Sequence, residues 1–185
     1  HKMVFVNSET QDQFGKALAA QNKFLFNLRY SAYSNFQAAI NEAYMSLGVF
    51  GHAIIQMIPD LKRKRVCYQT LPIKEFYIDK DAFGYINTFY RVVDMKMRSV
   101  MQQFPDYMPE KYKDRTDTKW LDDNIEVLHV VEPSFKKGDK YHTAYIDLTN
   151  QAIMEEPQEM SYSQYLCVRS AVFPSSDDPY GFSPC

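Results

Sequence analysis

The sequence has few cysteines and no long apolar run. Its 185 residues include 3 cysteines, Cys67, Cys167 and Cys185, which are scattered and odd in number. They form neither the disulfide framework of a small secreted protein nor a CxxC metal pair, which favours a reducing compartment. The longest apolar stretch, Tyr44 to Ile58, is interrupted by glycines and falls short of the about 20 residues that cross a bilayer. We therefore expect no membrane association.

The chain also lacks a strong charge of either sign and every common catalytic motif. Its 21 Lys plus Arg and 23 Asp plus Glu leave a net charge of −2. This balance excludes a protein whose main task is to coat nucleic acid or an anionic membrane, since both need a large cationic surface. No GxSxG, GxxxxGK(S/T), GxGxxG or HExxH motif occurs, and the 4 histidines lie far apart. We expect no enzymatic activity, no catalytic residue, no cofactor and no metal site.

Aromatic residues, by contrast, are abundant. The chain contains 14 Tyr and 13 Phe, and aromatic residues make up 15% of it. This share exceeds what one small core needs, so we expect some aromatic surface to serve contacts with other chains.

The first 50 residues have the pattern of helices. Ser8 and Gln11 have the spacing of a capping box, so a helix should begin there. A spacing of three and four then links Phe26, Tyr30, Tyr33, Ile40, Tyr44 and Leu47, with the polar Gln37 at the one remaining place. Ser34 and Gln37 repeat the cap spacing. The stretch is therefore either one long helix or a pair of helices that meet near Ser34.

Two glycines follow this helical stretch. We predict that Gly48 ends the helix, because glycine adopts the left-handed conformation at a helix end at low cost. Gly51 should complete a tight turn into the next element. Because this turn leads out of a helix, it offers no helix N-terminus to a phosphate group. Gly48 and Gly51 are therefore predicted to be structural turn residues.

Beyond residue 50, apolar residues alternate with polar ones in short runs. The predicted strands are 53–58, 65–71, 76–78, 86–93, 125–131, 141–148 and 165–173. Asp94 should cap a short helix that stops before Pro105, and Pro109 should start another. Since no long helix separates the strands, the sheet should be mainly antiparallel. We predict a single α+β domain over 1–185, helical over 1–50 and β-rich over 51–185.

The densest charge run lies between two of these strands. It consists of Lys62, Arg63, Lys64 and Arg65. One interpretation is a contact with DNA phosphates, or with an acidic face of a neighbouring subunit such as the Glu155–Glu159 stretch. The other is a solvated hairpin tip that protects strand edges. The sequence leaves both interpretations open.

Six short motifs follow one another in a fixed order over most of the chain. They are SNFQAAINEAYMSLGVFG (34–51), LPIKEFYI (71–78), GYINTFYR (84–91), VMQQF (100–104), EVLHVV (126–131) and YGFSP (180–184). Together they resemble segments of the head-to-tail connector, or portal, proteins of short-tailed bacteriophages. Two positions depart from the pattern. Phe182 replaces a basic residue of the last motif, and His52 stands where a small residue is usual.

The resemblance implies that the chain is the peripheral wing portion of a longer virion structural protein. The complete subunit would form a dodecameric ring at one capsid vertex, through which DNA is packaged and ejected and to which the tail attaches. It would be assembled in the host cytoplasm with capsid, scaffold, terminase and tail proteins as partners. DNA would pass through the ring, with weak or no direct binding by this fragment.

Two other classes of function stay open from the residues themselves. One is a small binding module with a Tyr-rich surface. The other is a hydrolase or transferase whose catalytic residues come from loops such as Asp106–Asp123.

Overall fold

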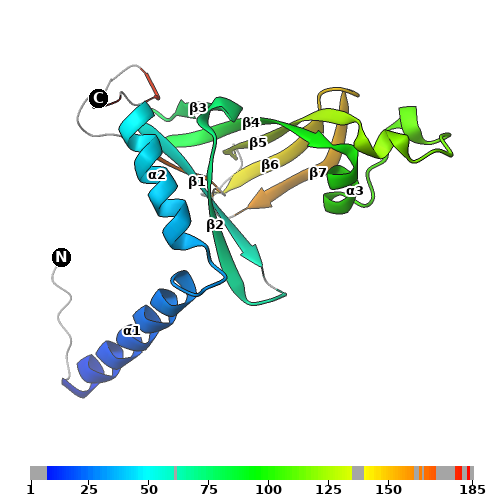
Figure 1. The fold of residues 1–185 in the computed structure, drawn as a ribbon. Coiled ribbons are helices and arrows are strands. Elements are labelled where there is room, and N and C mark those ends of the chain that lie inside the picture. The colour runs from blue at the N-terminus through cyan, green and yellow to red at the C-terminus, as the bar shows by residue number, and fades with distance from the viewer. Residues whose placement is uncertain are drawn as a thin grey trace.

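The described part of the chain consists of a pair of N-terminal helices followed by two antiparallel sheets (Figure 1). The computed structural model describes residues 8–60, 62–134, 140–160, 163, 165–169, 178–180 and 183. The helices are α1 (Ser8–Arg29), α2 (Phe36–Phe50), α3 (Met97–Gln103) and three 3₁₀ turns, η1 (Ile73–Glu75), η2 (Glu110–Tyr112) and η3 (Lys119–Asp122). The strands are β1 (His52–Asp60), β2 (Arg65–Leu71), β3 (Phe76–Lys80), β4 (Ile86–Lys96), β5 (Asn124–Pro133), β6 (Tyr141–Asp147), β7 (Ala152–Met160) and β8 (Tyr165–Arg169). The predicted α+β class is confirmed.

The strands form one sheet of order β2-β1-β8 and a second of order β3-β4-β5-β6-β7. Every pairing is antiparallel, as predicted. Strand β7 was not predicted, because Glu155, Glu156 and Pro157 interrupt its apolar alternation. These residues are tolerated because β7 is an edge strand. The predicted strand 165–173 is described only as far as Arg169.

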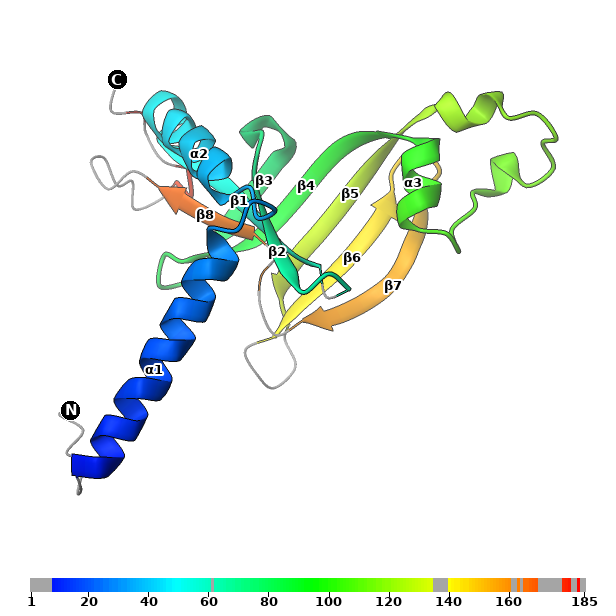
Figure 2. The ribbon, with the colours of Figure 1, turned by 60° about the horizontal axis from the view of Figure 1, so that its bottom comes forward.

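The three-stranded sheet packs on one face of the five-stranded sheet. The buried side chains between them are Ile54, Leu71, Phe76, Ile78, Phe89, Val131 and Tyr165. Helix α2 packs on the opposite face of the three-stranded sheet, where Ala43 of the helix contacts Ala53 and Ile55 of β1. The described body is therefore layered as helix, small sheet and large sheet, and α1 projects from it (Figure 2).

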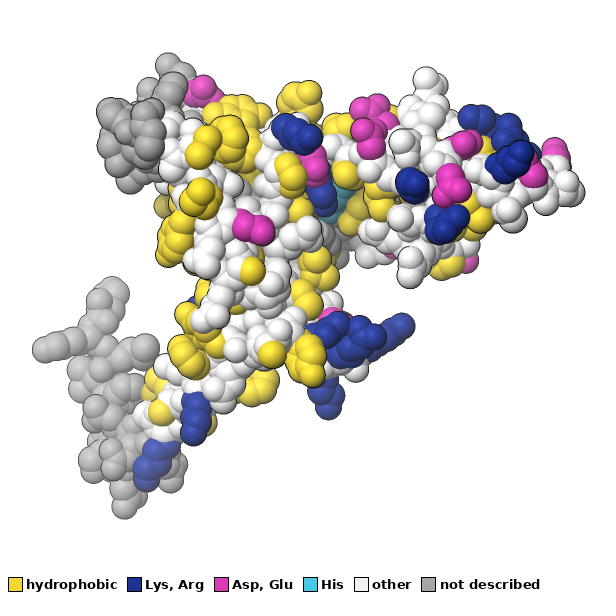
Figure 3. Space-filling model, in the orientation of Figure 1, with side chains coloured by type: hydrophobic (Ala, Val, Ile, Leu, Met, Phe, Trp, Pro, Cys, Tyr) yellow, Lys and Arg dark blue, Asp and Glu magenta, His cyan; other side chains and the backbone are white. Residues whose placement is uncertain are grey.

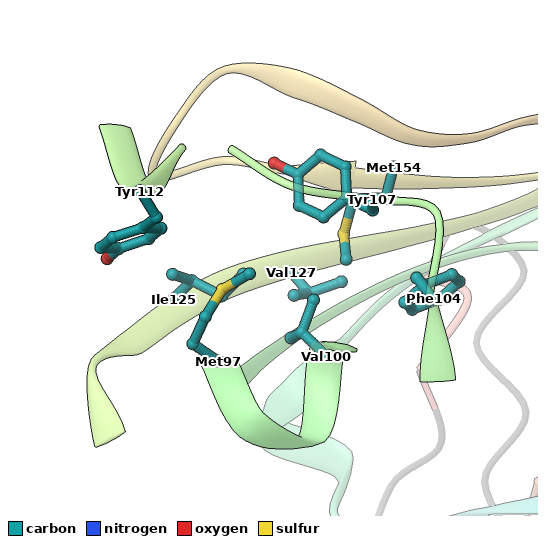
Figure 4. Packing of buried hydrophobic residues seen from close by; sticks show 8 residues of the cluster. All are labelled: Met97, Val100, Phe104, Tyr107, Tyr112, Ile125, Val127 and Met154. Carbon is teal, nitrogen blue, oxygen red and sulfur yellow. The ribbon is translucent and has the colours of Figure 1, made fainter. Parts of the chain in front are cut away.

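The remaining part of the same face of the large sheet is covered by α3 and the segment that follows it. Figure 4 shows this cluster, which consists of Met97, Val100, Phe104, Tyr107, Tyr112, Ile125, Val127 and Met154. The Tyr107 hydroxyl donates a hydrogen bond of 2.8 Å to the fully buried carboxylate of Asp147. The Asn150 backbone and side-chain N–H groups donate to the same carboxylate at 2.8 and 2.7 Å. A buried carboxylate with these donors is satisfied.

The prediction that Asp94 caps α3 was wrong. Asp94 lies inside β4, opposite Glu126 of β5, and α3 begins only at Met97. The strand continues because Val93 and Met95 pack against the buried cluster beneath α3. The Met97 N–H donates instead to the Asp123 carbonyl at 2.9 Å.

The helical stretch is a pair of helices, and the chain turns between them at Ser34 and Asn35. Asn35 adopts φ 55, which breaks the helical path. The hydroxyl of buried Ser34 donates to the Ser31 carbonyl at 2.9 Å and accepts from the Phe36 N–H at 3.3 Å. The Tyr68 N–H donates to the Ser34 carbonyl at 2.8 Å. This bond fixes the corner between the helices to β2.

The two predicted turn glycines differ in their backbone conformations. Helix α2 continues past Gly48 to Phe50, so the prediction that Gly48 ends the helix was wrong. The left-handed residue is Gly51, which has φ 76 and whose N–H donates to the Leu47 carbonyl at 3.0 Å. Both are glycines near the helix end, but the helix requires the left-handed conformation only at Gly51.

We predict opposite effects when alanine replaces the two glycines. A Cβ atom at Gly48 would meet no atom within 4 Å apart from its chain neighbours and the backbone of its own helix, so Gly48→Ala should raise the free energy of unfolding by up to about 1 kcal/mol. Gly51→Ala should lower it by about 1 kcal/mol, because the left-handed conformation is strained for a residue with Cβ. Thermal melts of the two variants measure this difference. Equal melting temperatures would contradict the assignment of the turn to Gly51.

A buried side-chain cluster joins the two sheets. The Tyr165 hydroxyl on β8 lies 2.6 Å from His129 Nδ1 on β5, and His129 Nε2 lies 2.8 Å from Thr143 Oγ1 on β6. His129 also stacks on Tyr145, with ring centroids 4.1 Å apart. A neutral imidazole satisfies both partners by accepting at one nitrogen and donating at the other. Burial, and secondarily the Arg91 charge, lower the pKa of His129 to about 3.

This low pKa predicts a loss of stability in mild acid. The unfolded chain binds a proton at His129 below about pH 6.5, whereas the folded chain does so only near pH 3. The free energy of unfolding should therefore fall by up to about 1.4 kcal/mol per pH unit from pH 6.5 downward. His129→Gln should be less stable than the parent at pH 7. Its free energy of unfolding should also depend less steeply on pH, by about 1.4 kcal/mol per pH unit, because the variant lacks the proton that His129 binds in the unfolded chain. His142→Gln, a control in the same sheet, should keep it. Denaturant melts at about pH 5 to 7 test this, and an unchanged slope in His129→Gln would contradict it.

Candidate interaction site

The four cations singled out in the sequence lie at the tip of the β1–β2 hairpin. Asp60 of β1 pairs with Arg65 of β2, and Lys62, Arg63 and Lys64 form the turn between them. In Figure 3 the dark blue side chains gather at this tip and stand out from the body. We call residues 62–65 the basic tip.

Asp60 fixes the two arginines of the basic tip. It accepts a hydrogen bond of 3.1 Å from the Arg63 N–H and one of 2.9 Å from Arg65 Nε. The Arg63 N–H, and after it the Arg65 side chain, hold the pKa of Asp60 below its ordinary value. Among the described residues, neither Lys62 nor Lys64 has an ion-pair partner. Asp60 therefore anchors the two arginines of the tip, and the two lysines carry no ion pair within the described structure.

A groove separates the basic tip from α1. Its volume is about 520 Å³, and its lining consists of Phe24, Asn27, Leu28, Ser31, Tyr33, Arg63, Lys64 and Arg65. The Arg65 guanidinium lies 5.8 Å from the centre of the Tyr33 ring, within the range of a cation–π contact. The exposed fractions of Phe24 and Tyr33 are 64% and 72%. The predicted aromatic surface is thus present beside the cations.

A second surface, which sequence reasoning missed, is the outer face of the five-stranded sheet. Its inner face is covered by the small sheet and by α3. The strand register places two rows of mainly apolar side chains on the outer face, Tyr77–Tyr90–Val130–Ala144 and Val92–Leu128–Ile146–Ile153. None of these residues belongs to a buried cluster of the described structure. Alternation along each strand could have indicated this face, but only the register shows that the rows are continuous.

Two carboxylates lie directly beside these rows. Asp94 and Glu126 are exposed cross-strand neighbours, and the described residues provide neither with an ion-pair partner. They line a hollow of about 560 Å³ together with Lys74, Glu75, Tyr77, Val92, Val93 and Leu148. Glu75 is paired with Arg91 at 2.9 Å, which leaves Asp94 and Glu126 as the unpaired acids of the hollow. We call it the acidic hollow.

The described residues contain no cluster of His, Cys, Asp and Glu that could hold a metal ion. Cys67 and Cys167 are free and partly buried, and burial raises the pKa of the Cys167 thiol to about 11. The third cysteine, Cys185, lies outside the described residues. Within the described part, none of the helices has the length and apolar character needed to cross a membrane.

The described structure is thus a layered α+β body that exposes aromatic residues, a basic tip and an acidic hollow. The chain belongs to the family of bacteriophage head to tail connecting proteins, whose family model matches residues 27–185. The resemblance found in the six motifs is thereby confirmed.

One curated relative is described as a "Probable portal protein" of Bordetella phage BPP-1. It is 28% identical to this chain over 163 residues, which cover 83% of this chain and 29% of the relative. The match therefore spans less than a third of the relative's length.

Proposed function

We propose that the chain is a structural part of a phage portal, the ring at one capsid vertex through which DNA is packaged and ejected. The observation that carries this proposal is the match of the connector family to residues 27–185. The portal relative supports it. In this account the chain has no catalytic role and contributes rigid structure and contact surfaces to the virion.

We further propose that the chain is the peripheral wing portion of its subunit, and that complete subunits assemble as a dodecamer in the host cytoplasm. A ring needs each subunit to present surfaces for its neighbours at a fixed spacing. The exposed aromatic side chains of α1 and of the α1–α2 corner suit such surfaces, because aromatic residues supply much of the energy of protein interfaces. Capsid, scaffold, terminase and tail proteins are the further partners that a portal would contact.

The basic tip belongs to this proposal as a site of contact within the particle. Lys62, Arg63 and Lys64 are exposed, so they contribute little to folding by burial. The net charge of −2 for the chain suits a peripheral region past which DNA moves without being held tightly.

The location of the full-length protein in the particle tests the portal function. Gold-labelled antibodies against the chain should mark a single vertex of purified capsids, because a portal occupies one vertex. A nonsense mutation in the gene should give heads without packaged DNA, and the full-length gene supplied in trans should restore packaging. Label spread over all capsid faces, or DNA-filled heads from the nonsense mutant, would refute the proposal.

A further inference from the structure

We propose that the basic tip of one copy docks into the acidic hollow of a neighbouring copy, with Lys62 and Lys64 facing Asp94 and Glu126. This inference rests on the proposed ring and identifies two surfaces that would form its subunit interface. It concerns a contact between identical chains and involves no other ligand.

The neighbouring acids Asp94 and Glu126 carry an electrostatic cost. Asp94 of β4 and Glu126 of β5 are cross-strand neighbours and both are exposed. Neither forms an ion pair with a described residue, although Lys74 lines the same hollow. Like charges directly opposite each other in a sheet are destabilising. A cationic partner would remove this repulsion. The two unpaired lysines of the basic tip are suitable donors, since ammonium groups form charge-assisted hydrogen bonds to carboxylates.

Apolar surface borders both the acids and the basic tip. The row Val92–Leu128–Ile146–Ile153 lies next to the acid pair, and Ile153 is 61% exposed. The basic tip is likewise bordered by apolar side chains, those of Phe24, Leu28 and Tyr33 in its groove. Each surface therefore combines apolar area with charge of one sign. Complementary charge fixes partner and register, and apolar burial adds affinity.

The basic tip and the acidic hollow belong to different sides of the large sheet. The small sheet, which carries the basic tip, packs on the inner face of the large sheet, whereas the acidic hollow lies on the outer face. A subunit therefore cannot place its own tip in its own hollow. Two different complementary surfaces on one chain make a head-to-tail contact, which closes into a ring when the rotation between subunits permits.

Two other partners for the basic tip are less well supported. DNA phosphates would satisfy the lysines but would leave the acid pair and the apolar rows unmatched. The β7 edge carries Glu155, Glu156 and Glu159, but Glu155 accepts a hydrogen bond from Gln158 and Glu159 pairs with Lys140 at 3.1 Å. The acidic hollow thus provides the more complete match.

A charge-swap experiment in the full-length protein tests the contact. Lys62→Glu with Lys64→Glu should raise the protein concentration needed for ring assembly by about tenfold at low salt, because it places four like charges together. Asp94→Lys with Glu126→Lys should do the same. Combining all four changes should restore assembly to within about threefold of the parent. Electron microscopy counts the rings, and thermal melts verify that each subunit remains folded.

The matched control is Glu156→Lys, an exposed acid on β7, combined with the two lysine reversals. It should not restore assembly. If Glu156→Lys restored assembly of the lysine reversals, the β7 edge would be the partner and the proposal would be overturned. Normal assembly of the lysine reversals with loss of packaging would identify DNA and would also overturn it. If the parent protein forms no ring at all, the proposed portal function is wrong. If the parent forms rings and the charge reversals leave assembly unchanged, only the proposed contact is wrong.

Discussion

The packing of Tyr165 between the two sheets is the constraint on which the rest of the structure depends. Its ring lies against Phe76 and Phe89 of the large sheet, at centroid distances of 5.1 and 5.6 Å, and its hydroxyl reaches His129 at 2.6 Å. Tyr165 itself belongs to β8 of the small sheet. The contact therefore fixes the orientation of the small sheet, and with it the basic tip, relative to the acidic hollow. If water entered the contact between the two sheets, or if its packing were looser, the basic tip and the acidic hollow could move relative to each other.

The low net charge of the chain does not prevent it from presenting local patches of charge. The value of −2 arises because 21 Lys and Arg nearly balance 23 Asp and Glu, and the basic tip and the acidic hollow place some of these charges on separate surfaces. Separate patches of opposite sign steer identical subunits toward one mutual orientation and disfavour others. Near-neutrality of the whole chain is thus compatible with the charge-guided assembly proposed above, and a chain with so little net charge has little general attraction for DNA.

Patterns within single elements could be predicted from the sequence, whereas contacts between elements could not. The capping spacing at Ser8 and the alternation of apolar residues located α1 and most strands, because both depend on local chemistry. Whether Gly48 or Gly51 ends α2 depends on where the helix meets β1, which the sequence does not show. Strand β7 was not predicted because its charged residues, which an edge strand tolerates, interrupt the apolar alternation. The basic tip was visible as a charge run. The acid pair was not, because Asp94 and Glu126 become neighbours only through the register of β4 and β5.

Hydrogen exchange tests the central claim that the two sheets behave as one rigid unit. The backbone amides of β1, β5 and β8 should exchange through openings of the same free energy, equal to that of global unfolding, because the Tyr165–His129 contact couples the sheets. Tyr165→Phe, which removes the hydroxyl, should lower the protection of β5 and β8 together. Amides of β1 and β8 that exchange through a separate, lower-energy opening while β5 stays protected would contradict this claim.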